Sequence, residues 1–124
     1  MSSFEQPAGR RSWKQNTFRR SERITGNADF SDLIKNGTKY STQDILFYSR
    51  KTDLSHSRFG VAAPKRLGSA PLRNRCKRRL RELFRTNKDA VPKGFDILAV
   101  ITKDISYKKF NDVADAFMQA VGRL

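Results

Sequence analysis

The chain has 124 residues, 37% of them hydrophobic, so it can form one domain with an ordinary core. Its formal net charge of +14 makes the folded chain repel itself until an anion neutralises it. No apolar run approaches the roughly 20 residues of a membrane span, and the N-terminus lacks the apolar core of a signal peptide. We therefore expect a cytoplasmic protein with a polyanionic partner. Cys76 is the only cysteine, which excludes an intramolecular disulfide, and with His56 as the only histidine no zinc site of recognisable spacing can form.

Residues 1–20 form a polar, basic N-terminal segment in which Phe4, Trp13 and Phe18 are the large apolar side chains. This composition predicts a disordered arm, followed by a single folded domain over residues 21–124. An auxiliary contact to the polyanionic partner and a solvated tail without a role explain the charges of the arm equally well. Those charges belong to Arg10, Arg11, Lys14, Arg19 and Arg20.

A short helix is predicted from Asn27, which can cap its N-terminus, to Asn36 and Gly37, which end it. The side chains of Phe30, Leu33 and Ile34 recur at helical spacing and give this helix one apolar face.

Strands are predicted at Ile45–Tyr48 and at Arg58–Ala63, and a further short strand is possible near Lys39 to Thr42. The polar stretch at residues 52–57 reads as a turn, so we expect the two longer strands to pair as a hairpin.

The next helix, at about Leu72 to Arg85, has one apolar stripe and is otherwise almost wholly cationic. The stripe consists of Leu72, Cys76, Leu80, Leu83 and Phe84. The cations are Arg73, Arg75, Lys77, Arg78, Arg79, Arg81 and Arg85, and Glu82 is the sole acid among them. A cationic run is often just a solvated face, but here too few acids relieve the repulsion, which favours binding of phosphates.

The run Phe95–Ile101 is nearly all apolar and predicts a central strand covered on both faces. A closing amphipathic helix is predicted from Phe110 to Val121, with Val113, Ala114, Phe117 and Met118 also at helical spacing. Strands and helices in this order predict an α+β fold, a two-layer α/β sandwich.

No protein catalytic site is visible in the pattern. His56 in its turn is expected to be structural, and Cys76 on the apolar stripe is expected to be a small core residue. Acids lie scattered near strand ends, where a pair could meet and hold Mg²⁺, but their spacing equally fits ordinary turn and surface acids. They are Asp44, Asp53, Asp96 and Asp104.

The cationic helix resembles the signature of the bacterial ribonuclease P protein family, whose members belong to the ribonucleoprotein that removes 5′ leaders from precursor tRNA. The similarity rests on Arg73-Asn74-Arg75, then Lys77-Arg78, then Arg81-Glu82 and Phe84. It extends over about Arg19 to Leu124 and includes Asp29-Phe30, Gly37, Tyr48, Gly60, Lys65-Arg66, Gly68 and Asp96-Ile97.

The resemblance implies that the protein binds a catalytic RNA and the precursor tRNA, and that Mg²⁺ acts through the RNA, with no cofactor bound by the protein alone. It also implies a left-handed crossover through the basic helix, a topology shared with a ribosomal protein domain. The residues implied to contact the RNA subunit are Arg73, Asn74, Arg75, Lys77, Arg78 and Arg81. Those implied to bind the 5′ leader are Phe30, Ile34, Tyr48, Lys65 and Arg66, although for Phe30 and Tyr48 the residues alone favour core packing.

Two other classes of protein fit the charge pattern. A structural RNA-binding protein, such as a ribosomal protein, would share it but would not promote cleavage of precursor tRNA. A nuclease acting alone would cleave RNA in a metal-dependent way that an Asp→Ala change abolishes.

Overall fold

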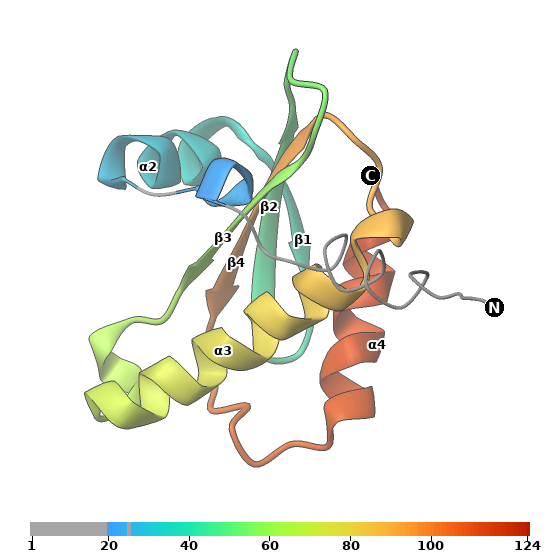
Figure 1. Ribbon diagram of the computed structural model, residues 1–124. Helices are drawn as coiled ribbons and strands as arrows, with labels where there is room; N and C mark the ends of the chain where they lie inside the picture. The colour runs from blue at the N-terminus through green and yellow to red at the C-terminus, as the bar shows by residue number, and fades with distance from the viewer. Residues whose placement is uncertain (1–19, 25) are drawn as a thin grey trace, which may run out of the picture.

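The computed structural model describes residues 20–24 and 26–124, and Figure 1 shows how their helices and strands are arranged. In chain order these are η1 (Arg20–Glu22), α2 (Asn27–Asn36), β1 (Thr38–Ser41), β2 (Ile45–Lys51), β3 (Arg58–Ala62), η2 (Lys65–Leu67), α3 (Ala70–Thr86), η3 (Lys88–Ala90), β4 (Phe95–Ile101) and α4 (Phe110–Val121). The predicted basic arm lies outside the described residues except for Arg20, which begins η1.

The strands form one four-stranded sheet in the order β1-β2-β4-β3. β2 pairs antiparallel with both β1 and β4, whereas β3 pairs parallel with β4. The predicted hairpin between Ile45–Tyr48 and Arg58–Ala63 is therefore wrong, because the apolar strand β4 occupies the central place between them. The possible short strand near Lys39 to Thr42 is confirmed as β1.

The first helix, α2, has the predicted length, but its N-cap is Gly26 and Asn27 is its first residue, so the predicted Asn27 cap is wrong. Gly26 has a φ of 117°, a conformation that glycine adopts without a steric penalty. The helix ends before Gly37, whose N–H donates to the carbonyl oxygen of Leu33 at 2.8 Å.

The sheet separates two apolar clusters of unequal size. α3 and α4 cover one face, and α2 lies on the other (Figure 1). The large cluster beneath α3 and α4 is built around Phe47, Phe59, Leu80, Phe84, Ile101 and Phe117. The small cluster beneath α2 contains Ile24, Leu33, Tyr48 and Leu98. Because residues on a strand alternate between faces, β2 and β4 contribute to both clusters.

The α+β prediction is confirmed, with α2 partly covering the second face of the sheet. β3 and β4 are parallel neighbours joined through α3, as the resemblance implies. In Figure 1, seen from the α3 side with both strands pointing down, β4 lies to the right of β3, which makes the crossover left-handed. Within the described residues, no helix combines the length and apolar character needed to cross a membrane.

Candidate nucleic-acid interface

The cationic helix α3 is held rigidly on the sheet by its apolar stripe. Ser69 caps its N-terminus, with its side chain accepting a hydrogen bond from the N–H of Leu72 at 3.4 Å, and Pro71 lies in the first turn. Cys76 and Leu80 are fully buried, and the ring of Phe84 stacks on Phe59 of β3 at 4.9 Å. This packing fixes which side of α3 faces solvent.

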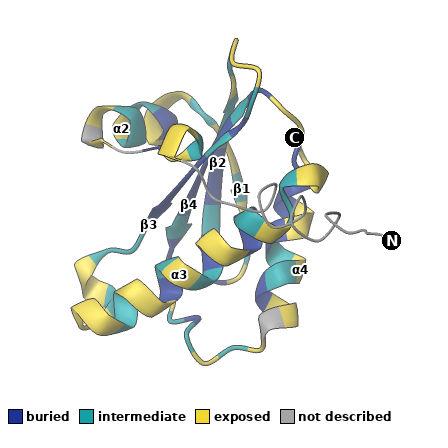
Figure 2. Cartoon of the chain, viewed as in Figure 1, coloured by how far each residue is buried: buried dark blue, intermediate teal, exposed yellow. Residues whose placement is uncertain are grey.

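The side of α3 that faces away from the sheet is largely exposed (Figure 2). Asn74, Arg75, Arg78 and Arg81 are exposed, while Arg73 and Lys77 are half-buried. The predicted contact residues are therefore brought together on one helix. We call these six residues, five cations and Asn74, the α3 cation row.

Two further arginines of α3 have structural partners. Arg79 donates hydrogen bonds from Nη1 to the carbonyl oxygens of Ile105, at 3.3 Å, and Lys108, and so ties α3 to the segment between β4 and α4. Arg85 pairs with Glu82 at 2.5 Å, and this hydrogen bond lowers the pKa of the Glu82 carboxyl. Glu82, the sole acid of α3, is thus paired with Arg85 and does not compensate the positive charge of the α3 cation row.

The α3 cation row borders two different recesses of the surface. Arg75 and Arg78 line one recess together with Arg79, Glu82 and Ser106, which follows β4. Lys77 and Arg81 line another, between α3 and the outer edge of β3. A polyanion lying along α3 would therefore meet cations on both flanks of the helix.

The residues predicted to bind a leader are only partly brought together by the structure. Phe30 and Tyr48 belong to the same small cluster beneath α2, whereas Ile34 on the same helix is 48% exposed. Tyr48 is 8% exposed, so most of its ring is packed within the protein. Lys65 and Arg66 lie exposed in η2, directly after β3 and Pro64.

Three apolar residues on this sheet face were missed by the sequence reasoning. Leu46, Ala62 and Val100 sit side by side on β2, β3 and β4, and all are half-buried beside the small cluster. The signal was the two-residue alternation from Tyr48 to Leu46, which places both on one face. This alternation does not identify the three residues as a group, because only the pairing of the strands brings Val100 and Ala62 next to Leu46.

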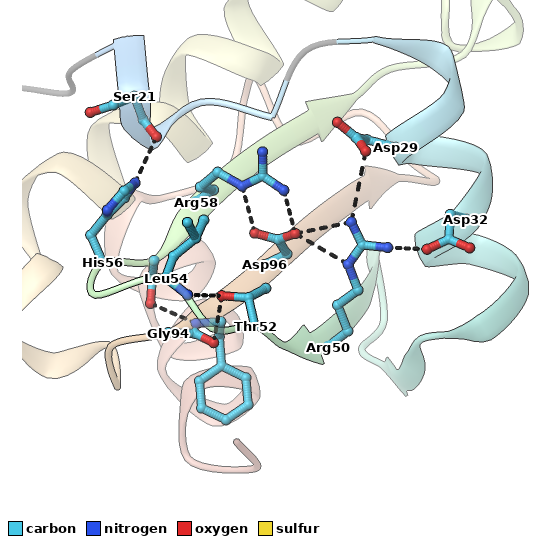
Figure 3. Close-up of polar contacts among 12 residues, drawn as sticks. Ser21, Asp29, Asp32, Arg50, Thr52, Leu54, His56, Arg58, Gly94 and Asp96 are labelled. Atoms are coloured by element: carbon cyan, nitrogen blue, oxygen red, sulfur yellow. Dashed lines mark hydrogen bonds and ion pairs between the residues drawn. The ribbon is translucent and has the colours of Figure 1, made fainter.

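A buried carboxylate joins α2 to this sheet face (Figure 3). Asp96 of β4 is 0% exposed and receives hydrogen bonds from Arg58 Nε at 2.8 Å, Arg58 Nη2 at 2.6 Å and Arg50 Nε at 3.2 Å. Arg50 also pairs with Asp32 and lies 3.8 Å from Asp29, both on α2. The network therefore links β2, β3 and β4 to the helix that carries Phe30.

The pKa values of this network follow from burial and charge. Burial by itself raises the pKa of Asp96, but the hydrogen bonds and positive charges of Arg58 and Arg50 outweigh it and leave the pKa below its ordinary value. The hydrogen bond with Asp96 in turn raises the pKa of Arg58. Asp96 is therefore ionised at neutral pH and anchors both arginines.

The other titratable side chains singled out in the sequence have structural surroundings. Cys76 is buried, as predicted, and burial raises the pKa of its thiol, which lies 3.6 Å from Asp104 Oδ1. His56 Nε2 lies 3.0 Å from the carbonyl oxygen of Ser21, which fits the predicted structural role. Asp44 pairs with Lys108. In the described part of the chain, no three His, Cys, Asp or Glu side chains gather as metal ligands would.

Comparisons with known proteins find relatives over most of the chain. The family described as Ribonuclease P matches residues 18–124. The ribonuclease P protein component of Thermotoga maritima is 38% identical over 90 residues, covering 73% of this chain and 77% of that protein, and that of Syntrophus aciditrophicus is 33% identical over 100 residues, covering 81% and 84%.

Two solved structures have the same fold. The RNase P protein from Thermotoga maritima superposes with a TM-score of 0.76 at 32% identity, covering 83% of this chain and 97% of that one. A mutant RNase P protein from Staphylococcus aureus gives a TM-score of 0.76 at 25% identity, covering 90% and 94%.

Proposed function

Because the chain belongs to the bacterial ribonuclease P protein family, and so is a protein component of an endoribonuclease of tRNA processing, we propose that its α3 cation row binds the catalytic RNA and its α2-side sheet face binds the 5′ leader of precursor tRNA. The observation that carries the proposal is the solvent-facing side of α3, where Asn74, Arg75, Arg78 and Arg81 are exposed while Cys76, Leu80, Leu83 and Phe84 of the stripe are buried.

The chemistry of α3 suits an RNA backbone. Arginine forks form bidentate, charge-assisted hydrogen bonds with phosphate oxygens, and their planar groups are weakly hydrated. The packing of α3 on the sheet fixes its backbone before the RNA arrives, so the ordering needed on binding is that of the arginine side chains. In this proposal the RNA supplies the reaction together with its Mg²⁺, and the protein binds and positions.

The sheet face beneath α2 suits a single strand. Phe30 of α2 packs on the same small cluster as Leu46 and Val100 of the sheet, Ile34 is exposed on the same helix, and Lys65 and Arg66 follow at the end of β3. Single-stranded RNA is bound by apolar and aromatic faces for the bases together with cations for the backbone, and this face supplies both. Tyr48, being nearly buried, supports Phe30 and Leu33 from below more than it offers a stacking face.

Reconstitution tests the proposal as a whole. The purified chain is mixed with a bacterial ribonuclease P RNA and precursor tRNA at a low Mg²⁺ concentration at which the RNA alone is slow. We expect the chain to restore cleavage at the mature 5′ end and to show no cleavage without the RNA. Failure to stimulate the RNA, with a chain shown to be folded, would refute the proposal.

The leader-binding part makes a separate prediction. Phe30→Ala should weaken binding of precursor tRNA to the reconstituted enzyme about tenfold, since stacking of one base contributes about 1–3 kcal/mol, and should leave mature tRNA binding unchanged. Met118→Ala, an equally apolar truncation at a 40% exposed position of α4, serves as the control. An equal loss for both tRNAs would contradict leader binding by Phe30.

A further inference from the structure

The outer edge of β3 borders a recess of about 240 Å³, in which the proposed function so far involves only Lys77 and Arg81 of α3 and Phe30 of α2. β3 is an edge strand, and in the described part of the chain its outer side is met by an isolated parallel bridge between Arg23 and Phe59, in which Ile24 N–H donates to the Phe59 carbonyl at 3.0 Å. Among the described residues, the bridge pairs the outer edge of β3 at Phe59 and does not extend to the residues that follow. Val61, two residues on, turns its backbone groups to the same side and lines the recess.

Three cations from two separate segments converge on this recess. Lys77 and Arg81 are four residues apart and so lie on one side of α3, and Arg23 comes from the segment before α2. No carboxylate is among the described residues that line it. The neighbouring acid Glu22 pairs with Lys88 at 3.1 Å, on the other side of the segment.

The floor of the recess is closed tightly around Gly60. A Cβ added at Gly60 would lie 3.0 Å from Cε1 of Phe30 and 3.1 Å from Cβ of Ile24. The absence of a side chain there lets the segment that carries Arg23 approach β3, and so brings Arg23 toward α3. Burial, and then the charge of Arg23, lower the pKa of Arg81, as is expected for two like charges that lie near each other.

We propose that the recess formed by Arg23, Lys77, Arg81 and the outer edge of β3 at Val61 is a binding pocket for one backbone phosphate of the RNA that α3 binds. The proposal rests on the proposed function and adds to it a residue from outside α3, together with a strand edge. A phosphate would relieve the repulsion between Arg23 and Arg81, and the N–H groups at a strand edge can donate to its oxygens. One phosphate would then bind in this pocket on one side of α3, while Arg75 and Arg78 would bind other phosphates of the RNA on the other side.

Titration with inorganic phosphate tests the pocket directly. Amide and guanidinium NMR signals of the full chain are followed as phosphate replaces chloride at constant ionic strength. We expect saturable shifts at Val61 N–H and at the Nε–H groups of Arg23 and Arg81, and an about fivefold loss of affinity in Arg23→Gln, the size expected for one charge-assisted hydrogen bond in a partly exposed site. Arg123→Gln, at the opposite edge of the sheet where Arg123 lies over Tyr40, is the matched control and should change nothing. Shifts that rise linearly without saturation would overturn the pocket.

Binding of the catalytic RNA separates failure of the pocket from failure of the proposed function. Arg23→Gln and Arg75→Gln should each lower the slope of log affinity against log salt by about 0.7–0.9. If Arg75→Gln lowers the slope and Arg23→Gln does not, the pocket is wrong while RNA binding by α3 stands. If neither variant lowers it, both proposals fail.

Discussion

Asp96→Asn is expected to lower the free energy of unfolding by about 3 kcal/mol, the usual scale when one partner of a buried ion pair is removed. The substitution keeps the size of the side chain but removes the charge that holds Arg58 and Arg50, while Asp96 itself is fully buried. Arg50 would then keep its contacts to Asp29 and Asp32 on α2 but would lose its anchor on β4. Chemical denaturation followed by circular dichroism measures the loss.

The difference in the free energy of unfolding between the wild-type protein and the Asp96→Asn variant should depend on pH. The folded-state pKa of Asp96 is lowered, so its stabilisation is complete above the unfolded value of about 3.9 and is lost as the pH falls through the folded pKa. We therefore expect a constant difference between about pH 6 and 8 and a shrinking one below about pH 4. Asp53→Asn, at an exposed turn position, is the control and should have no such effect. A difference that grows on acidification would contradict the ionised state of Asp96.

The second large effect concerns RNA affinity. The double variant Arg75→Ala and Arg78→Ala is expected to bind the catalytic RNA about 100-fold more weakly at physiological salt, because each lost charge-assisted contact costs about 1.5 kcal/mol. Both side chains are exposed, and alanine favours helix, so α3 should remain folded. Filter binding or fluorescence anisotropy over a salt series gives the affinity and its slope.

A matched control removes the same charge elsewhere. Lys93→Ala with Arg123→Ala takes two exposed cations away from α3 and should weaken binding much less than the α3 variant does. Equal losses in the two double variants would mean that net charge, and not the placement of cations on α3, governs the interaction.

The helices and strands of this fold were largely predictable from local patterns, but those patterns did not predict the pairing of the strands, of which only the parallel neighbours joined by α3 were implied by the family resemblance. Local patterns placed β2, β3, α3, β4 and α4 within a few residues of their observed positions. The hairpin prediction failed because the turn at residues 52–57 resembles any reversal of the chain, while the pairing of β3 with β4 spans all of α3. Only the packing of β4, apolar enough to be covered on both faces, decides that it lies between β2 and β3.

The α3 cation row was also predictable, because exposed and buried residues on one helix follow from its periodicity. The sheet face beneath α2 was not predictable from the residues alone, since it depends on residues from α2, β2, β3 and β4 that meet only in the folded chain. Asp96 shows the difference most clearly: in the sequence it is one of several scattered acids near strand ends, and in the fold it binds arginines from both neighbouring strands. Tyr48 likewise proves nearly buried, so the sheet residues beside it offer the more accessible surface.

Tethered hydroxyl-radical cleavage tests most directly whether the exposed side of α3 lies against the catalytic RNA, as we propose. Because Cys76 is fully buried, a cysteine introduced on the surface can be labelled selectively with an iron chelate. Ala70→Cys places the probe at the exposed N-terminal end of α3, and Asp115→Cys places it on the exposed side of α4. We predict strong, localised cuts in the RNA from position 70 and weak or no cuts from position 115. Cuts from position 115 alone would contradict the assignment of α3 as the RNA-binding surface.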